Sequence, residues 1–220
     1  MITMKNVDLT FGARRILENV ELSVKPGEFV FLVGPTGTGK STLLRLLYMD
    51  LKPDNGSIQV GDYLSSEITK KQIPMLRRKV GVVFQDFKLL EDRSVFENVA
   101  FSLYVTGAKK SEIKKRVLRV LADVGLSHRR NALPKDISGG EKQRTAIARA
   151  LINEPFVLLA DEPTGNLDPE AAGEIMELLE TINMRGTAVL MATHNYEIIG
   201  KAGARVMQLK EGKLTIAEKK

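Results

Sequence analysis

A glycine-rich segment, "GPTGTGKST" at residues 34–42, has residue types suited to binding a polyphosphate. It fits the spacing G-x-x-x-x-G-K-[ST], in which glycines let backbone N–H groups wrap phosphates, lysine reaches the β- and γ-phosphates, and serine holds Mg²⁺. The alternative is an ordinary glycine-rich turn, but the lysine–serine pair and the apolar run before it favour a phosphate loop. The residues expected to contact nucleotide here are Gly34, Pro35, Thr36, Gly37, Thr38, Gly39, Lys40, Ser41 and Thr42.

Two adjacent carboxylates follow a second apolar run, in "FVLLADEP" at residues 156–163. Because side chains alternate along a strand, Asp161 and Glu162 are expected to point to different sides. One carboxylate can then join a magnesium shell while the other reaches an attacking water. We therefore assign Asp161 to magnesium and Glu162 to the general base. A solvated turn at the strand end is the alternative, and the phosphate loop in the same chain favours the chemical role.

A second segment also has the features of an anion-binding helix start. In "ISGGEKQRTAIARAL", residues 137–151, a serine and two glycines stand directly before a helical pattern. Small residues at a helix N-terminus expose N–H groups, and the helix dipole there favours negative charge. The chain therefore carries two predicted phosphate-facing helix starts, and the residues alone assign no anion to the second.

The elements that must position these residues are strands and helices in alternation. Continuous apolar runs predict strands buried on both faces. Apolar stripes predict helices, with Ser111 and Asp168 as expected N-caps of two of them and Pro169 at the first helical position of the second. The predicted strands are residues 2–9, 20–24, 28–33, 57–60, 80–84, 156–160, 187–193 and 205–209, and the predicted helices are 42–49, 111–126 and 168–182.

This alternation predicts an α/β fold with a mainly parallel sheet. No convincing strand pattern occurs between about residues 87 and 152, so this stretch is expected to be a helical insertion. The predicted organisation is one domain over 1–220, with a catalytic α/β core formed by 1–86 and 153–220 and a helical subdomain formed by 87–152.

Composition narrows the class of protein. The chain has 220 residues, 43% of them hydrophobic and 27% charged, as is ordinary for a globular protein. Cysteine is absent and there are only two histidines, which argues against disulfides and against thiolate or histidine metal clusters. No apolar stretch approaches the length of a membrane span, and the N-terminus lacks a signal-peptide layout, so a cytoplasmic chain is expected. The net charge of +6 suits a solvated basic surface; nucleic-acid binding is weakly supported, because the basic clusters are not interleaved with aromatics.

Together with "ISGGEKQ", these motifs resemble the ATP-binding-cassette (ABC) ATPase family over essentially the whole chain. The resemblance implies the P-loop NTPase fold of that family, with an antiparallel β part beside the parallel sheet. It also implies Mg²⁺-dependent hydrolysis of ATP to ADP and phosphate. In that family two cassettes pack head to tail in an ATP-dependent dimer. The segment that residues 137–143 match, the signature segment, completes the ATP site of the other cassette. Ser138, Gly139, Gly140 and Glu141 would then face the γ-phosphate of ATP held by Lys40 of a second chain.

The resemblance assigns further residues one by one. Phe11 matches an aromatic that stacks on adenine, with a core aromatic as the equal alternative. Gln85 matches a glutamine that contacts Mg²⁺ and the water and reports to the membrane partner. Asp168 matches a loop that crosses the dimer interface, although its role as an N-cap is sufficient by itself. His194 matches a histidine that contacts the γ-phosphate. The expected catalytic residues are Glu162, His194, Gln85 and Lys40, and the expected metal ligands are Ser41, Gln85 and Asp161.

Two residues depart from the family pattern. Glu141 stands where glutamine is commonest, and Asn195 stands where aspartate usually follows the histidine. Neither removes an essential group, so an active ATPase is expected.

The stretch "LLADEPTGNLD" at 158–168 is similar to the branch of lipoprotein-release, macrolide-export and cell-division ATPases. Residues 83–101 and 189–195 look most like the cell-division members, which act with the membrane protein FtsX and are thought to regulate cell-wall hydrolases. The apolar residues after Gln85 are expected either to line a groove for such a partner or to belong to the core: Phe87, Leu89, Leu90, Val95 and Phe96. This resemblance implies a location at the inner face of the cell membrane. The alternatives are the motor of a lipoprotein, drug or amino-acid transporter, which shares all the chemistry, and an ABC protein acting on DNA or ribosomes, for which 220 residues are too short.

Overall fold

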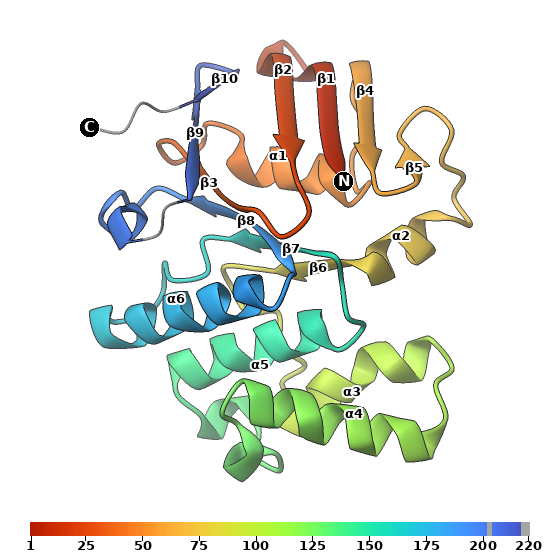
Figure 1. Ribbon diagram of the computed structural model, residues 1–220, viewed down its shortest axis with the longest axis vertical. Helices are drawn as coiled ribbons and strands as arrows, with labels where there is room; N and C mark the ends of the chain where they lie inside the picture. The colour runs from red at the N-terminus through yellow and green to blue at the C-terminus, as the bar shows by residue number, and fades with distance from the viewer. Residues whose placement is uncertain (202–203, 217–220) are drawn as a thin grey trace.

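A six-stranded sheet runs through the middle of the molecule in the computed structural model, which describes residues 1–201 and 204–216 (Figure 1). Its strand order is β10-β9-β3-β8-β7-β6, and all neighbours pair in parallel except β10 with β9. The mainly parallel sheet predicted from the apolar runs is confirmed. Its strands are β3 (Phe29–Val33), β6 (Val80–Val83), β7 (Val157–Asp161), β8 (Ala188–Thr193), β9 (Arg205–Lys210) and β10 (Lys213–Ile216).

A second, antiparallel sheet lies at the top of the view in Figure 1, with strand order β2-β1-β4-β5. The turn between β9 and β10 joins the two sheets, because the Glu18 N–H in β2 donates to the Gly212 carbonyl at 2.8 Å. The strands of this sheet are β1 (Ile2–Phe11), β2 (Arg14–Val24), β4 (Asn55–Val60) and β5 (Tyr63–Leu64).

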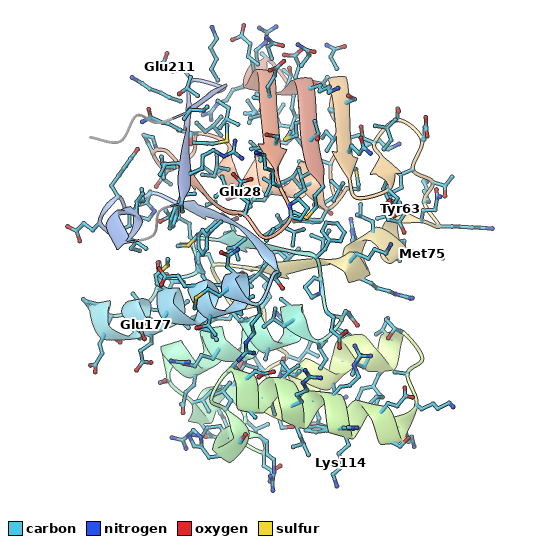
Figure 2. The ribbon with its side chains drawn as sticks, viewed as in Figure 1. Glu28, Tyr63, Met75, Lys114, Glu177 and Glu211 are labelled. Carbon is cyan, nitrogen blue, oxygen red and sulfur yellow. The ribbon has the colours of Figure 1, made fainter. Side chains whose placement is uncertain are left out.

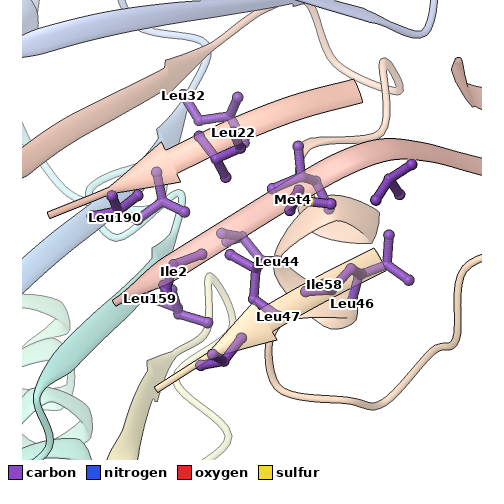
Figure 3. Packing of buried hydrophobic residues seen from close by; sticks show 14 of the residues in the cluster. Ile2, Met4, Leu22, Leu32, Leu44, Leu46, Leu47, Ile58, Leu159 and Leu190 are labelled. Atoms are coloured by element: carbon purple, nitrogen blue, oxygen red, sulfur yellow. The ribbon is translucent and has the colours of Figure 1, made fainter. Parts of the chain in front are cut away.

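Alternation along β3 divides the core into two layers. Val30 and Leu32 face a cluster formed with the antiparallel sheet and with α1, whereas Phe29 and Phe31 face a cluster formed with α3, α4, α5 and α6. Figure 3 shows the first cluster, where side chains from β1, β2, β4 and α1 meet Leu32, Leu159 and Leu190. The six-stranded sheet therefore separates α1 from the other large helices.

The helices lie on both sides of that sheet. Their bounds are α1 (Lys40–Leu47), α2 (Ile73–Lys79), α3 (Val95–Val105), α4 (Lys110–Asp123), α5 (Gly139–Leu151) and α6 (Pro169–Met184), with short 3-10 helices η1 (Ser127–Arg129), η2 (Pro134–Asp136) and η3 (Glu197–Lys201). The stretch 87–152 contains α3, α4 and α5 and none of the described strands. Charged side chains such as Lys114 on α4 and Glu177 on α6 point away from the body of the molecule (Figure 2).

Several boundary predictions were wrong, including the end of α4, which lies at Asp123 rather than at residue 126. Strand β2 begins at Arg14 rather than near residue 20. Helix α1 begins at Lys40, directly after its N-cap Gly39, and it ends before residue 49 because Met49 (φ 54°) leaves the helical region. Ser111 is not an N-cap: helix α4 already includes Lys110, and its N-cap Lys109 makes no side-chain capping bond. Asp168 does cap α6, since its Oδ1 accepts from the Ala171 N–H at 2.9 Å.

Besides the three short 3-10 helices, two helices and two strands were not predicted individually: α2, α3, β5 and β10. Helix α2 is one of the shortest helices, and α3, "VFENVAFSLYV", carries apolar residues on most of its sides, so neither shows a clear stripe. Within the described ranges, no helix is long and apolar enough to span a bilayer.

Candidate ATP-binding and catalytic site

The carboxyl ends of four parallel strands meet at one edge of the sheet, and the predicted chemical residues follow directly from them. Val33 of β3 pairs with Thr193 of β8, and Asp161 of β7 pairs with Ala192 of β8. The phosphate loop, the two carboxylates and His194 thus emerge side by side. This edge is where open α/β sheets bind their ligands.

The phosphate loop has a backbone that requires glycine at defined points. Gly34 has φ 156°, and a Cβ there would lie 2.3 Å from the Leu209 carbonyl oxygen. Gly39, with φ 105°, is the N-cap of α1, and a Cβ on it would lie 2.9 Å from Ile16. No side chain caps α1, and its first turn holds no acidic residue. The N–H groups at the start of the helix are therefore available to bind an anion held by the loop.

Lys40, Glu162 and His194 form one contact network. The Lys40 Nζ donates to the Gly34 carbonyl at 2.8 Å and lies 3.4 Å from Glu162 Oε1. His194 Nδ1 lies 2.9 Å from the same carboxylate oxygen, and the His194 backbone N–H reaches Glu162 Oε2 at 3.3 Å. Glu162 is 8% exposed and has a left-handed backbone with φ 48°. Strain at a buried acidic residue is typical of functional sites.

Asp161 stands beside the start of α1 with a carboxylate that is not fully satisfied. Its Oδ1 is buried and has no hydrogen-bond partner. Burial raises the pKa of this carboxyl and Glu162 adds to the effect, against the opposing influence of the Ser41 hydroxyl, Lys40 and Lys88. A magnesium ion would give the orphaned oxygen a partner and reverse the cost of its charge. Asp161 and Ser41 therefore fit a magnesium site, with Gln85 further along the same edge.

Gln85 follows β6 and is exposed. Its carbonyl accepts a hydrogen bond from the Asn166 side chain at 3.0 Å, so the loop after β6 contacts the loop after β7. Of the apolar residues that follow it, Val95 is fully buried in the core, whereas Phe87, Leu89, Leu90 and Phe96 are half-buried.

The signature segment begins α5 with a capping box. The Ser138 Oγ accepts from the Glu141 N–H at 3.2 Å, and the Glu141 carboxylate accepts from the Ser138 N–H at 2.9 Å. Burial acts to raise the pKa of Glu141, but the bond from Ser138 and the Arg129 guanidinium outweigh it and lower that pKa. This leaves the N–H groups of Gly139 and Gly140 without intrahelical partners. The segment lies on the opposite side of the sheet from α1, so it does not join the network around Lys40.

Phe11 and Asn195 both lie near the ends of strands, and the structure shows their surroundings. Phe11, at the end of β1, is 46% exposed, which excludes the core alternative and leaves its ring accessible to a nucleobase. Asn195 Oδ1 accepts from the Glu197 N–H at 2.9 Å at the start of η3, a role that aspartate would fill equally.

Several contacts at this edge were missed from the sequence. Arg14 pairs with Phe11 across the β1–β2 turn, and its guanidinium donates to the Gly37 carbonyl at 3.3 Å. Asn166 lies inside the "TGNLD" stretch, where the sequence pattern indicates no role for it. The other missed side chains, Asn98 and Arg149, bind the backbone after Gln85. All of these side chains bind main-chain groups, most of them distant in sequence, and no motif spacing indicates such contacts.

Comparison with known proteins decides the family. The ABC transporter family model matches residues 17–165, which include the phosphate loop, Gln85, the signature segment and both carboxylates. The chain belongs to the ABC transporter ATPase family. Its relatives include the cell division ATP-binding protein FtsE of Bacillus subtilis, 50% identical over 96% of this chain and 93% of that protein. FtsE of Escherichia coli is 42% identical over 97% of each chain.

Solved structures agree with this assignment. The ATP-binding cassette MJ0796 in a dimeric post-hydrolysis state bound to ADP and Pi has a TM-score of 0.87 and 35% identity, covering 100% of this chain and 98% of that one. CbiO1 of Clostridium perfringens has a TM-score of 0.90 and 32% identity, covering 98% of this chain and 86% of that one. The ABC-ATPase fold is thereby confirmed. The chain is an ATP-hydrolysing ABC subunit of the cell-division type.

Proposed function

We propose that two copies of this chain bind Mg²⁺-ATP between them, head to tail, and relay the cycle of closure and hydrolysis to an FtsX-like membrane partner. In this proposal the chain works at the inner face of the cell membrane in the regulation of cell-wall hydrolases. The proposal keeps the division into a catalytic core, 1–86 and 153–220, and a helical subdomain, 87–152.

One observation carries the crosswise arrangement. The start of α1 and the carboxylates of β7 converge at one edge of the sheet, while the free N–H groups of Gly139 and Gly140 begin a helix packed on the opposite face. A chain folded in this way keeps its own signature segment away from its own Lys40. A second copy turned head to tail supplies the missing anion, the γ-phosphate, to that segment. The dimeric MJ0796 cassette bound to ADP and Pi supports an assembly of two chains by analogy.

The residues of the edge then take the following parts. Backbone N–H groups of Gly34–Thr42 surround the phosphates, and Phe11 stacks on the base. Lys40 leaves the Gly34 carbonyl for the β- and γ-phosphates. Glu162, freed from Lys40, accepts the proton of the attacking water, while His194 orients the γ-phosphate. Asp168 and Glu141 complete the contact between chains.

Ser41, Asp161 and Gln85 would hold Mg²⁺, which, when bound, neutralises charge developing on the phosphates. ATP makes more contacts in the closed dimer than in the open one. It therefore shifts the population toward closure, and hydrolysis removes that bias.

Replacing Glu162 with Gln tests the base and the dimer together. The variant keeps the shape of the site but cannot accept a proton, so we expect ATP binding to persist, hydrolysis to fall about 100-fold or more, and closed dimers to accumulate. Turnover and sedimentation with ATP measure both. Hydrolysis at the wild-type rate would remove Glu162 from the role of base.

Mixed dimers give the matching control for the crosswise site. A chain carrying Ser138→Arg paired with a chain carrying Lys40→Ala keeps one intact composite site, so about half of the tight nucleotide binding should remain. Binding that is normal at both sites or lost at both would contradict the head-to-tail arrangement.

The partner is tested by co-purification from membranes. Half-buried Phe87, Leu89 and Leu90 lie beside Gln85, where a membrane protein could sense the nucleotide state. We expect an FtsX-like membrane protein to co-purify with the wild-type chain, and Leu89→Asp to release it while leaving ATP binding intact. A partner whose substrate stimulates hydrolysis in vesicles would instead indicate a transporter.

A further inference from the structure

Arg149 lies near the C-terminal end of α5, at the opposite end of the helix from Ser138. Its guanidinium donates to two consecutive main-chain carbonyls, those of Phe87, at 2.7 Å, and of Lys88. These residues belong to the loop that follows Gln85, 61 and 62 positions away in the chain. The planar guanidinium matches this pair of acceptors, which a lysine ammonium cannot bind in the same fixed geometry.

Arg149 has no acidic partner within ion-pair distance among the residues that the structure describes. Burial also lowers the pKa of its guanidinium. Removing a cation partly from water costs free energy, and here only carbonyl groups compensate that cost. The planar guanidinium in return fixes the direction of two peptide groups.

Those two peptide groups belong to a strained backbone. Phe87 has φ 57° and Lys88 has φ 48°, and they are the only consecutive non-glycine residues with left-handed φ in residues 1–201 and 204–216. Such conformations persist only where surrounding contacts determine them. The N–H groups of these residues bond within the turn, Phe87 to the Phe84 carbonyl at 3.3 Å and Lys88 to that of Asp86. The two hydrogen bonds from Arg149 fix their carbonyls from outside the turn.

The next residues are fixed from α3. The buried side chain of Asn98 bonds both backbone groups of Leu90, at 2.8 and 3.0 Å, and also binds the Arg93 and Ser94 carbonyls. Gln85 itself is bonded through Asn166 to the loop after β7. Gln85 is therefore bonded to the catalytic edge of the sheet, whereas Phe87, two residues later, is already bonded to helix α5.

We propose that Arg149 is a positioning residue, which fixes the Gln85 loop to α5 so that a displacement of α5 toward ATP in a second chain also moves Gln85. The inference rests on the proposed dimer only for that displacement; the hydrogen bonds themselves belong to a single chain. Arg149 acts through the backbone of Phe87 and Lys88 and does not touch nucleotide.

The test compares Arg149→Lys with Arg116→Lys in the full chain. Arg116 on α4 is a matched control, because it too donates to a main-chain carbonyl, that of Ile152 at 2.6 Å, but far from the Gln85 loop in sequence. Hydrogen exchange without nucleotide is followed at residues 86–90 and along α5. We expect Arg149→Lys to raise exchange at 86–90 about tenfold, with α5 unchanged, and Arg116→Lys to have no effect there.

Steady-state hydrolysis supplies the second readout. Because the phosphate loop is untouched, Arg149→Lys should lower kcat about tenfold while KM for ATP changes less than about twofold. Unchanged exchange at 86–90, equal loss of protection along α5, or a rise in KM at constant kcat would each overturn the proposal. Faster exchange with wild-type kcat would overturn it too, since Gln85 would then act independently of Arg149. Failure of the dimer itself appears separately, as absence of ATP-dependent dimers in Glu162→Gln.

Discussion

At the scale of single residues, the two adjacent carboxylates are compensated very differently. Glu162 has Lys40 and two nitrogens of His194 around it, whereas Asp161 has a buried oxygen with no partner. An unsatisfied buried group costs roughly 1–3 kcal/mol. The nucleotide-free protein therefore gives up stability at the position where magnesium is proposed to bind.

Replacing Asp161 with Asn should stabilise the nucleotide-free protein, by about 1 kcal/mol or roughly 2–4 °C in Tm, while abolishing Mg²⁺-dependent hydrolysis. Because the pKa of Asp161 is raised in the fold, its charge opposes folding near neutral pH, and that cost fades as pH falls through the raised pKa. The difference in Tm should accordingly shrink in acid. Thermal melts across pH measure it.

The control is Asp168→Asn, which replaces one good N-cap with another and should leave Tm within about 1 °C. A lower Tm for Asp161→Asn near pH 7 would show that its carboxylate is already satisfied.

At the scale of elements, α3 and α5 begin with the same device. Ser94 with Glu97, and Ser138 with Glu141, each form a capping box. Both boxes lie within residues 87–152, but only the second belongs to the signature segment. Comparing variants of the two boxes distinguishes the contribution of a cap to stability from its contribution to ATP hydrolysis.

Replacing Glu141 with Ala should destabilise the fold by about 1 kcal/mol and also slow ATP hydrolysis, because the signature turn loses its support. The lowered pKa of Glu141 means that its contribution is present above the ordinary value of 4.5 and is lost as pH falls through the lower folded value. Glu97→Ala is the control: it should destabilise in the same way without slowing hydrolysis. Equal kinetics in both variants would assign Glu141 a purely structural role. Urea unfolding and turnover measure the two effects.

The sequence predicted the setting of the phosphate loop correctly, because a buried apolar run before it and a helical pattern after it indicate its position between β3 and α1. The roles of Lys40 and Ser41 toward phosphate and magnesium stay predictions from residue types and spacing. The contact of Arg149 could not be predicted, because its partners are carbonyls of a loop whose side chains are irrelevant to the contact. The prediction of Ser111 as an N-cap was wrong, because it relied on residue type alone, and helix α4 already begins at Lys110.

At the scale of the whole molecule, the phosphate loop is supported by the last strands of the chain. Strand β3 lies between β8 and β9, and Gly34 packs against the Leu209 carbonyl in β9. The nucleotide site therefore depends on residues far along the sequence.

Gly34→Ala should destabilise the protein by about 3 kcal/mol or more, because its Cβ would lie 2.3 Å from a backbone oxygen that cannot move freely. Gly37→Ala is the matched control in the same loop, since a Cβ there meets nothing within 4 Å and only the left-handed φ of 79° is penalised. We expect about 1 kcal/mol for it. Denaturant midpoints compare them, and equal losses would contradict the role of the contact with β9.

The position of β3 between later strands also affects how the chain folds during its synthesis. Its flanking strands β8 and β9 are translated roughly 160 residues after it, which takes about 8–30 s at 5–20 residues per second. During that interval "FVFLV" has no strand neighbours, although it will become fully buried. A ribosome-bound chain halted before residue 188 should therefore present an apolar segment to chaperones and bind no nucleotide, whereas release past β9 lets the sheet close around it.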